Sequence, residues 1–234
     1  MRTRALLVAV VTLVLSACAP TTASDDRVDV LQLTDPITYY PFQTGAAWEY
    51  LQQGARLTDP RTTVVVEGPT VIDNGVWIGW RLIGPAREKR SYRQVTPAGV
   101  FLHSEIRLGI TTLTYDPPIQ EYPPEGVLRV GALWSGETDV TLQLHDGTEP
   151  EVRHLAYTYT VVDRRTVTIP AGTVEVFVIN LTSRLFDDDG MQVDEETYET
   201  WFAPFVGEVR LNTGHVLMRS NVPALTEAPG GGGG

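Results

Sequence analysis

Apolar and polar residues alternate along most of the chain with the period of two that is typical of β-strands. In the segment 139–144 every second residue is apolar (Val140, Leu142 and Leu144), with polar residues between them. The segment 155–161 repeats this pattern with leucine, tyrosine and valine at its odd positions. Because successive side chains of a strand point to opposite faces, each segment is expected to turn one face toward a core.

Turn residues separate these runs as they do in β-hairpins. Asn74-Gly75 and Asp146-Gly147 each stand between two β-rich runs, and such pairs favour tight turns that need positive φ. A further hairpin is expected to turn at 212–214, and a long strand pair is expected to be closed by the acidic segment around residue 188.

The run from Val174 to Leu181 is apolar on both faces, which predicts a central strand that is covered on two sides. No helical periodicity longer than two turns interrupts the strand pattern. The sequence therefore predicts an all-β protein of roughly a dozen antiparallel strands, arranged as curved sheets in an open barrel or a sandwich.

A short internal similarity suggests two related β units. FQTGAAWEY (42–50) and LRVGALWSG (128–136) share a Gly-Ala-x-Trp core, and a proline-glycine step leads into a strand at 95–102 and again at 202–211. A repeat with halves 36–122 and 123–222 would explain this pattern. Chance similarity between short strings is the alternative.

Three short motifs stand out along the chain: YPFQTGAAWEY, VTIPAGTVEVFVI and YETWFAPFVGEVRL. They resemble motifs that occur together in many uncharacterised bacterial lipoproteins, although APFVG has one residue more than the usual spacing. The resemblance implies secreted, membrane-tethered β domains with curved sheets, distantly like the open barrels of lipoprotein and lipid carriers. It brings no catalytic residues.

The N-terminus resembles the signal peptide of a bacterial lipoprotein. Arg2 and Arg4 precede an apolar run at 5–15, which is shorter than the roughly 20 residues of a membrane-spanning helix. Leu15-Ser16-Ala17-Cys18 then resembles a lipobox, and Cys18 is the only cysteine. The resemblance implies a diacylglyceryl group on the Cys18 sulfur, an N-acyl chain such as palmitate, and cleavage before Cys18. An ordinary signal peptide with a chance cysteine is the alternative.

These features divide the chain into a signal peptide (1–17), a lipidated cysteine with a flexible tether (18–35), a β-rich globular domain (36–222) and a glycine-rich tail (223–234) that is expected to be disordered. We expect the protein at the cell envelope, anchored by lipid to the outer membrane or to the periplasmic face of a bacterial membrane. Ala19 after the cysteine favours the outer membrane by resemblance to enteric sorting patterns. With Cys18 acylated, no disulfide and no cofactor beyond the covalent lipid is expected.

Composition excludes one class of partner. The formal net charge is −11, and removal of residues 1–17 leaves 16 basic against 29 acidic residues, which makes the net charge about −13. Proteins that bind nucleic acid need a basic footprint, so no nucleic acid is expected. An apolar content of 42% is enough for a substantial core.

An acidic segment offers a candidate calcium site at Asp187, Asp189, Asp194 and Glu196. Hard cations prefer several oxygen ligands, and part of the segment follows the spacing of an EF-hand loop. Leu185 occupies the first ligand position, however, and cannot coordinate a cation. The alternative is a solvated hairpin tip whose charges discourage edge pairing.

A basic run offers a candidate binding surface at Arg87, Lys89, Arg90 and Arg93. Such a cluster could hold the phosphates of lipid headgroups or an acidic partner. The alternative is an ordinary charged hairpin surface.

No local motif points to catalysis, so we expect a non-enzymatic protein. Gly-x-Ser-x-Gly, HExxH and phosphate-binding glycine motifs are missing from the sequence. The first hypothesis is an envelope lipoprotein whose β domain binds another envelope protein or serves a structural role. The second is a carrier of lipid or acyl chains, or a lipoprotein chaperone, with aromatic residues lining an apolar cavity (Tyr157, Tyr159, Phe177 and Trp201). A calcium-binding module or a hydrolase has less support.

Substitution of Cys18 tests the predicted anchor. Cys18→Ala removes the acceptor sulfur, so the protein is expected to leave the membrane pellet and to lose the mass of its acyl chains. Cell fractionation and intact-mass spectrometry measure both effects. A wild-type protein with an unmodified sulfur would contradict the lipoprotein hypothesis.

Overall fold

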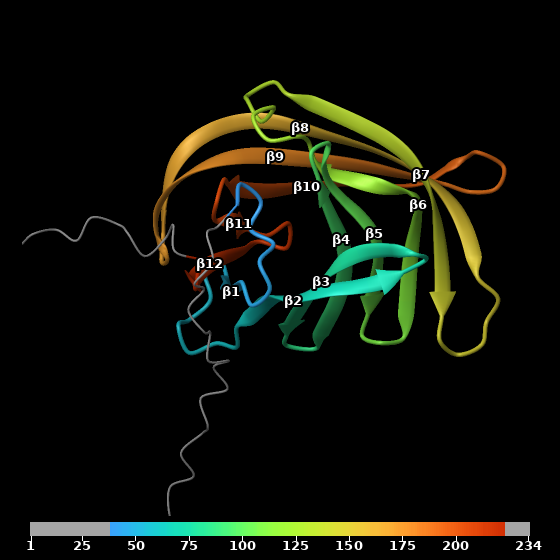
Figure 1. Ribbon diagram of the computed structural model, residues 1–234, viewed down its shortest axis with the longest axis horizontal. Coiled ribbons are helices and arrows are strands. Elements are labelled where there is room, and N and C mark those ends of the chain that lie inside the picture. Colours follow the sequence, from blue (N-terminus) through green and yellow to red (C-terminus); the bar gives the residue numbers. More distant parts are fainter. Residues whose placement is uncertain (1–37, 223–234) are drawn as a thin grey trace, which may run out of the picture.

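A computed structural model describes residues 38–222 of the chain. Its secondary structure consists of twelve β-strands: β1 (Ala47–Gln52), β2 (Thr62–Ile72), β3 (Gly75–Gly84), β4 (Arg87–Thr96), β5 (Gly99–Arg107), β6 (Thr111–Tyr122), β7 (Leu133–Leu144), β8 (Glu151–Ile169), β9 (Gly172–Phe186), β10 (Gln192–Ala203), β11 (Gly207–Arg210) and β12 (His215–Ser220). Each strand pairs antiparallel with the next along the chain (Figure 1). The predicted all-β, antiparallel architecture is confirmed.

Pairing between the first and last strands closes the sheet into a barrel. β1 pairs with β12 from Trp48 opposite Ser220 to Gln52 opposite His215. Next to the Trp48–Ser220 pair, the Asn221 side chain accepts a hydrogen bond from the Ala47 amide at 2.9 Å. Both strands therefore have a hydrogen-bonded neighbour on each side. Within the described residues, no helix has the length and apolarity needed to cross a membrane.

The predicted hairpin turns are confirmed, with one shift of position. The β2–β3 turn has positive φ at Asp73 (47°) and Asn74 (64°), one residue earlier than the predicted Asn74-Gly75 pair. Gly75 instead begins β3 opposite Ile72. The turns near Gly147 and Gly214 also use positive φ, at 89° and 80°.

One end of the barrel, here called the closed end, is sealed by aromatic side chains. The segment 38–46 before β1 and the loop 123–132 between β6 and β7 both lie at this end. Tyr40 donates a hydrogen bond to the Pro123 carbonyl and packs against Phe202 and Tyr122, at centroid distances of 5.5 and 5.4 Å. Leu128 from the β6–β7 loop joins the same buried cluster.

The opposite end, here called the mouth, carries the other set of turns. Because consecutive strands run in opposite directions, the connections after β1, β3, β5, β7, β9 and β11 all lie there: 53–61, 85–86, 108–110, 145–150, 187–191 and 211–214. Leu108, in the β5–β6 turn, is 55% exposed and also lines an internal cavity. The interior therefore opens to solvent at this end.

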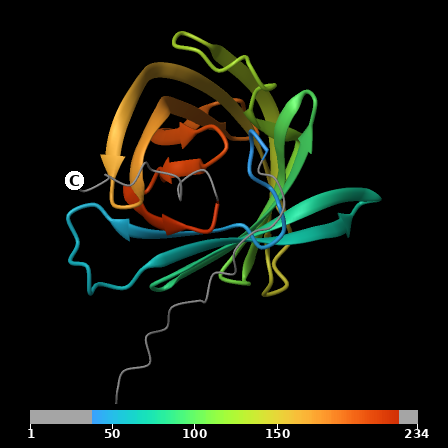
Figure 2. The same ribbon diagram turned by 60° about the vertical axis from the view of Figure 1, so that its left-hand side comes forward.

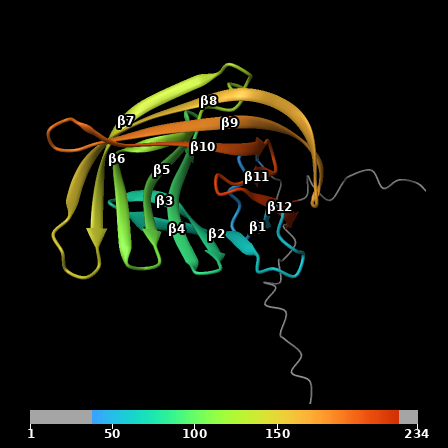
Figure 3. The same ribbon diagram turned by 180° about the vertical axis from the view of Figure 1, so that it is seen from behind.

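The longest hairpin adds a second layer over part of the barrel. β8 and β9 arch over β10, β11 and β12 in Figures 2 and 3. Val167 and Val176 from this hairpin pack in one cluster with Val209 and Leu217. The expected cover on two sides is observed for residues 176–179 of β9, whereas the rest of the predicted run 174–181 is half-buried or exposed.

Two loops six strands apart have the same geometry. Gly45 precedes β1 with φ 85°, and its amide donates to the Val66 carbonyl at 2.9 Å. Gly131 precedes β7 with φ 84°, and its amide donates to the Val161 carbonyl at 2.8 Å. This correspondence is what two six-strand halves, 36–122 and 123–222, would produce. The repeat itself stays a prediction.

The β4–β5 turn requires glycine at position 99. Gly99 has φ 127°, and a Cβ there would lie 2.2 Å from the Tyr122 carbonyl oxygen. Gly99→Ala is expected to lower the free energy of unfolding by at least about 2 kcal/mol, because it adds a steric clash to backbone strain. Urea unfolding followed by circular dichroism measures the loss.

Gly54→Ala is the matched control for Gly99→Ala. Gly54 has φ 83°, but a Cβ there would meet nothing within 4 Å. Only the conformational cost of about 1 kcal/mol is then expected. Equal losses in the two variants would contradict the close approach at Gly99.

Candidate functional site: an amphipathic cavity in the barrel

Two adjoining cavities occupy the barrel between the aromatic seal and the mouth. Their volumes are about 480 Å³ and about 550 Å³. Each lies within the range of about 300–1,000 Å³ that is typical of small-molecule sites. Both are lined by Lys89, Arg107, Tyr198 and Asn212, so these four residues mark the junction between the cavities.

The larger cavity has an extended apolar wall on β5–β9. Its members are buried or half-buried side chains that form one hydrophobic cluster: Leu102, Leu113, Tyr115, Ile119, Val140, Leu142, Leu155, Tyr157, Tyr159 and Leu181. They come from alternate positions of neighbouring strands, as the pairing of Leu113 with Leu142 shows. This surface is suited to hydrocarbon.

A buried carboxylate holds two cations at the junction. Lys89 donates to Glu105 at 2.6 Å, and Arg107 donates to the same carboxylate at 3.0 Å. Burial opposes ionisation of Glu105, but the charges and hydrogen bonds of Lys89 and Arg107 outweigh it and lower its pKa to about 2. Glu105 is therefore ionised at neutral pH, and it fixes the positions of both cationic groups.

A second ion pair lies deeper in the barrel. Arg93 donates two hydrogen bonds to Glu121, at 2.5 and 2.9 Å, and its guanidinium lies 4.5 Å from the centroid of the Trp80 ring. Burial opposes the charge on Arg93, but Glu121 more than compensates and raises the pKa of the arginine. Arg93 is thus paired within the protein itself.

Glu208 on β11 faces the smaller cavity. Its carboxylate accepts a hydrogen bond from the Tyr122 hydroxyl at 2.8 Å. Burial is the largest effect on this group and raises the pKa of Glu208 above its usual range.

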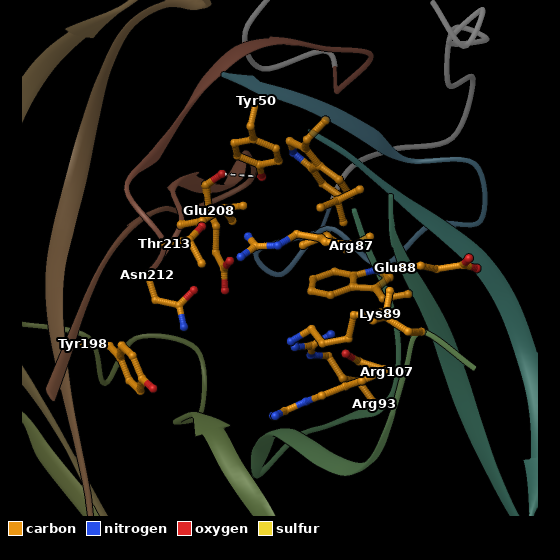
Figure 4. Close-up of a pocket in the computed structure, with 18 of the residues that line it drawn as sticks. Tyr50, Arg87, Glu88, Lys89, Arg93, Arg107, Tyr198, Glu208, Asn212 and Thr213 are labelled. Carbon is orange, nitrogen blue, oxygen red and sulfur yellow. Dashed lines mark hydrogen bonds between the residues drawn. The ribbon is translucent and has the colours of Figure 1, made fainter. Parts of the chain in front are cut away.

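Arg87 differs from the other interior cations. It lines the smaller cavity at the mouth end of β4, and Figure 4 shows its side chain pointing into that cavity. Within residues 38–222 its guanidinium has no ion-pair or hydrogen-bond partner. We call Arg87, Lys89 and Arg107 the cationic wall. Tyr198 and Asn212 lie across the cavity from it in Figure 4.

The structure divides the predicted basic cluster between two faces of the sheet. Arg87, Lys89 and Arg93 line the interior. Arg90 lies on the outer face, where it pairs with Glu67 at 2.8 Å. The four residues therefore do not form one continuous surface.

The predicted acidic residues also separate. Asp187 is engaged in the β9–β10 turn, where its Oδ1 accepts hydrogen bonds from the Asp189 and Met191 amides at 3.1 and 2.8 Å. Asp194 and Glu196 line the larger cavity. Over residues 38–222, no three histidine, cysteine, aspartate or glutamate side chains are grouped to hold a metal ion. The calcium site stays a prediction.

Two of the four predicted cavity aromatics line a cavity. Tyr157 and Tyr159 face the larger one. Phe177 belongs to the buried cluster at the closed end, and Trp201 lies beneath the guanidinium of Arg165 at 4.8 Å. Cys18, the predicted lipidation site, lies outside the described residues.

Five polar residues of the cavities could not be found from the sequence, because they belong to no recognisable motif: Glu105, Arg107, Glu121, Tyr198 and Glu208. Simple alternation would place Glu105 and Leu102 on opposite faces of β5. An irregularity between Leu102 and Ser104 changes the phase, so both face the interior. Without the register of the neighbouring strand, the sequence does not reveal this change.

Comparisons with known proteins give structural likeness only. No family model matches the chain, and no curated protein matches its sequence. The chain is similar to a solved structure from Parabacteroides distasonis ATCC 8503 whose name suggests a lipoprotein, with 13% identity and a TM-score of 0.39 over 80% of this chain and 99% of the other. It is also similar to one from Bacteroides fragilis NCTC 9343 whose name suggests an exported protein with a YmcC-like fold, with 15% identity and a TM-score of 0.40 over 79% and 99%.

Glu105→Gln tests the charge network at the junction. Loss of the carboxylate leaves Lys89 and Arg107 without their buried partner, so the free energy of unfolding at pH 7 is expected to fall by about 3 kcal/mol. The pKa of Glu105 is lower in the folded than in the unfolded protein. Its contribution is therefore complete above about pH 5 and is lost as the pH falls toward 2.

Urea unfolding of wild type and variant between pH 7 and pH 3 gives the measurement. The difference between the two proteins is expected to shrink as the pH falls. Glu195→Gln is the control, because that carboxylate is paired with Arg184 on the exposed surface. A difference at Glu105 that does not change with pH would contradict the proposed charge state.

Proposed function

We propose that this chain is a lipid-anchored protein of the bacterial cell envelope whose barrel holds an amphiphilic ligand without catalysing a reaction on it. The observation that carries the proposal is the interior of the barrel, where an apolar wall adjoins a cationic wall. A closed side-chain core would leave no room for a ligand. The acyl-chain carrier hypothesis therefore has more support than a purely structural role.

The shape of the interior supports a binding function. The aromatic cluster around Tyr40 seals one end, and the exposed turn at Leu108 borders the opening at the other. A ligand would enter at the mouth and place its apolar part against the wall around Leu142 and Leu155. Burial of hydrocarbon contributes about 0.8 kcal/mol for each methylene group.

The proposed anchor is compatible with this arrangement. The chain segment that leads from Cys18 enters the described structure at Thr38, beside the closed end. The mouth lies at the opposite end of the strands. The proposed tether would therefore join the described barrel at the end away from the entrance to the cavity.

One observation favours the alternative hypothesis that the domain binds an envelope protein. Leu108, Ile110 and Met191 are exposed apolar side chains on turns at the mouth. Exposed apolar residues around an opening are common at contact surfaces. A partner at this rim would be compatible with a ligand inside the barrel.

Native mass spectrometry of the detergent-extracted protein tests ligand binding. We expect the wild type to retain a lipid-sized adduct. Leu155→Trp is expected to reduce the adduct at least tenfold, because the larger side chain fills part of the cavity. Leu57→Trp is the control, since Leu57 is exposed and outside both cavities. Equal adducts on the two variants would overturn the proposal.

A further inference from the structure

We infer that the ligand is an amphiphile with an anionic head group, a carboxylate or a phosphate, and that the cationic wall of Arg87, Lys89 and Arg107 binds this group. The inference rests on the proposed function and specifies the chemistry of its ligand. Three observations support it: unbalanced charge, the position of the charges, and the character of the facing wall.

Positive charge exceeds negative charge on the cationic wall. Glu105 is the carboxylate that pairs with both Lys89 and Arg107, so one negative charge is shared between two positive ones. Arg87 adds a third positive charge without an ion-pair partner among the described residues. A single anionic group placed between these side chains would complete the network.

Lys89 and Arg107 are more exposed to the cavity than the carboxylate that holds them. The Glu105 side chain is only 6% exposed, whereas the Lys89 and Arg107 side chains are 35% and 55% exposed. The carboxylate therefore holds the cations from behind while their remaining donors face the cavity. Such fixed donors form charge-assisted hydrogen bonds without a large cost of ordering.

The cationic wall is directly next to the apolar wall. Glu105 on β5 is opposite Leu113 on β6, and Leu113 is opposite Leu142 on β7. All three side chains line the same cavity as Lys89 and Arg107. A head group at the junction would therefore place its hydrocarbon chain against leucine side chains within one or two strands.

The facing wall limits the charge of the head group. Asp194, Glu196 and Tyr198 on β10 line the larger cavity opposite β4 and β5. The Glu196 carboxylate accepts a hydrogen bond from Tyr198, and no cation pairs with Asp194 or Glu196 within residues 38–222. These carboxylates would repel additional negative charge. The site therefore suits one anionic group on the cationic side.

Competition among four probes with the same chain length tests the inference on the full-length protein. Stearate, stearoyl lysophosphatidate, stearyl alcohol and stearylamine are added to the extracted protein, and native mass spectrometry measures the occupancy of each. We expect at least one of the two anionic probes to bind at least tenfold more tightly than the alcohol and the amine. The ratio of stearate to lysophosphatidate distinguishes a carboxylate from a phosphate site.

Arg87→Gln is the decisive variant. Because Arg87 supports no ion pair within the described structure, its substitution is not expected to disturb folding. Binding of the preferred anionic probe is expected to weaken about tenfold, the loss for one charge-assisted hydrogen bond, while binding of stearyl alcohol stays unchanged. Arg129→Gln is the matched control, because Arg129 is an exposed arginine in the closed-end loop and outside both cavities.

The outcomes separate the two proposals. Equal binding of the alcohol and the anionic probes, unaffected by Arg87→Gln, would overturn the anionic head group and leave the amphiphile-binding function intact. Preference for stearylamine would also overturn it and would assign the head group to the carboxylates of β10. Failure of all four probes to bind, with no adduct on the native protein, would overturn both.

Discussion

Closure of twelve strands into one barrel is the constraint on which the rest of the structure depends. About eight strands enclose a space that side chains can just fill, so a wider closed barrel needs either a plug or a lumen. This protein has both. Aromatic residues around Tyr40 and Phe202 fill one end, and the remaining space is the amphipathic cavity. The cavity follows from strand number, and side chains determine its chemistry.

Charge deep inside the barrel is tolerated because the most buried carboxylates have partners. Glu105 and Glu121 are buried beside cations that hold them ionised. Glu208 has no ion pair within residues 38–222, accepts a hydrogen bond from Tyr122, and has a raised pKa because it is buried. Since an unpaired buried charge is costly, these pairs stabilise the fold. Arg87 has no ion-pair partner within residues 38–222, and Lys89 and Arg107 keep the donors that Glu105 does not use, so the proposed ligand would meet all three cations.

The fold could be predicted from the sequence further than the site could. Alternation in 139–144 and 155–161, and turn residues such as Gly147, are local signals, and the strands form where these signals are found. Barrel closure depends on pairing between β1 and β12, which no local pattern specifies. The site could not be predicted from the sequence for the same reason. The basic run contains Arg87 and Lys89, but their partner Glu105 and the facing Tyr198 come from other strands, and a change of phase in β5 conceals Glu105.

Pairing of the first strand with the last also limits the order in which the strands can pair during folding. β1 cannot complete its ladder until β12 is available, more than 160 residues later along the chain. A chain synthesised from its N-terminus would carry an unpaired edge on β1 until β12 follows, and such edges invite aggregation. Contacts this distant in sequence also slow folding. Assistance from a chaperone would matter most during this interval, before the final strand is available.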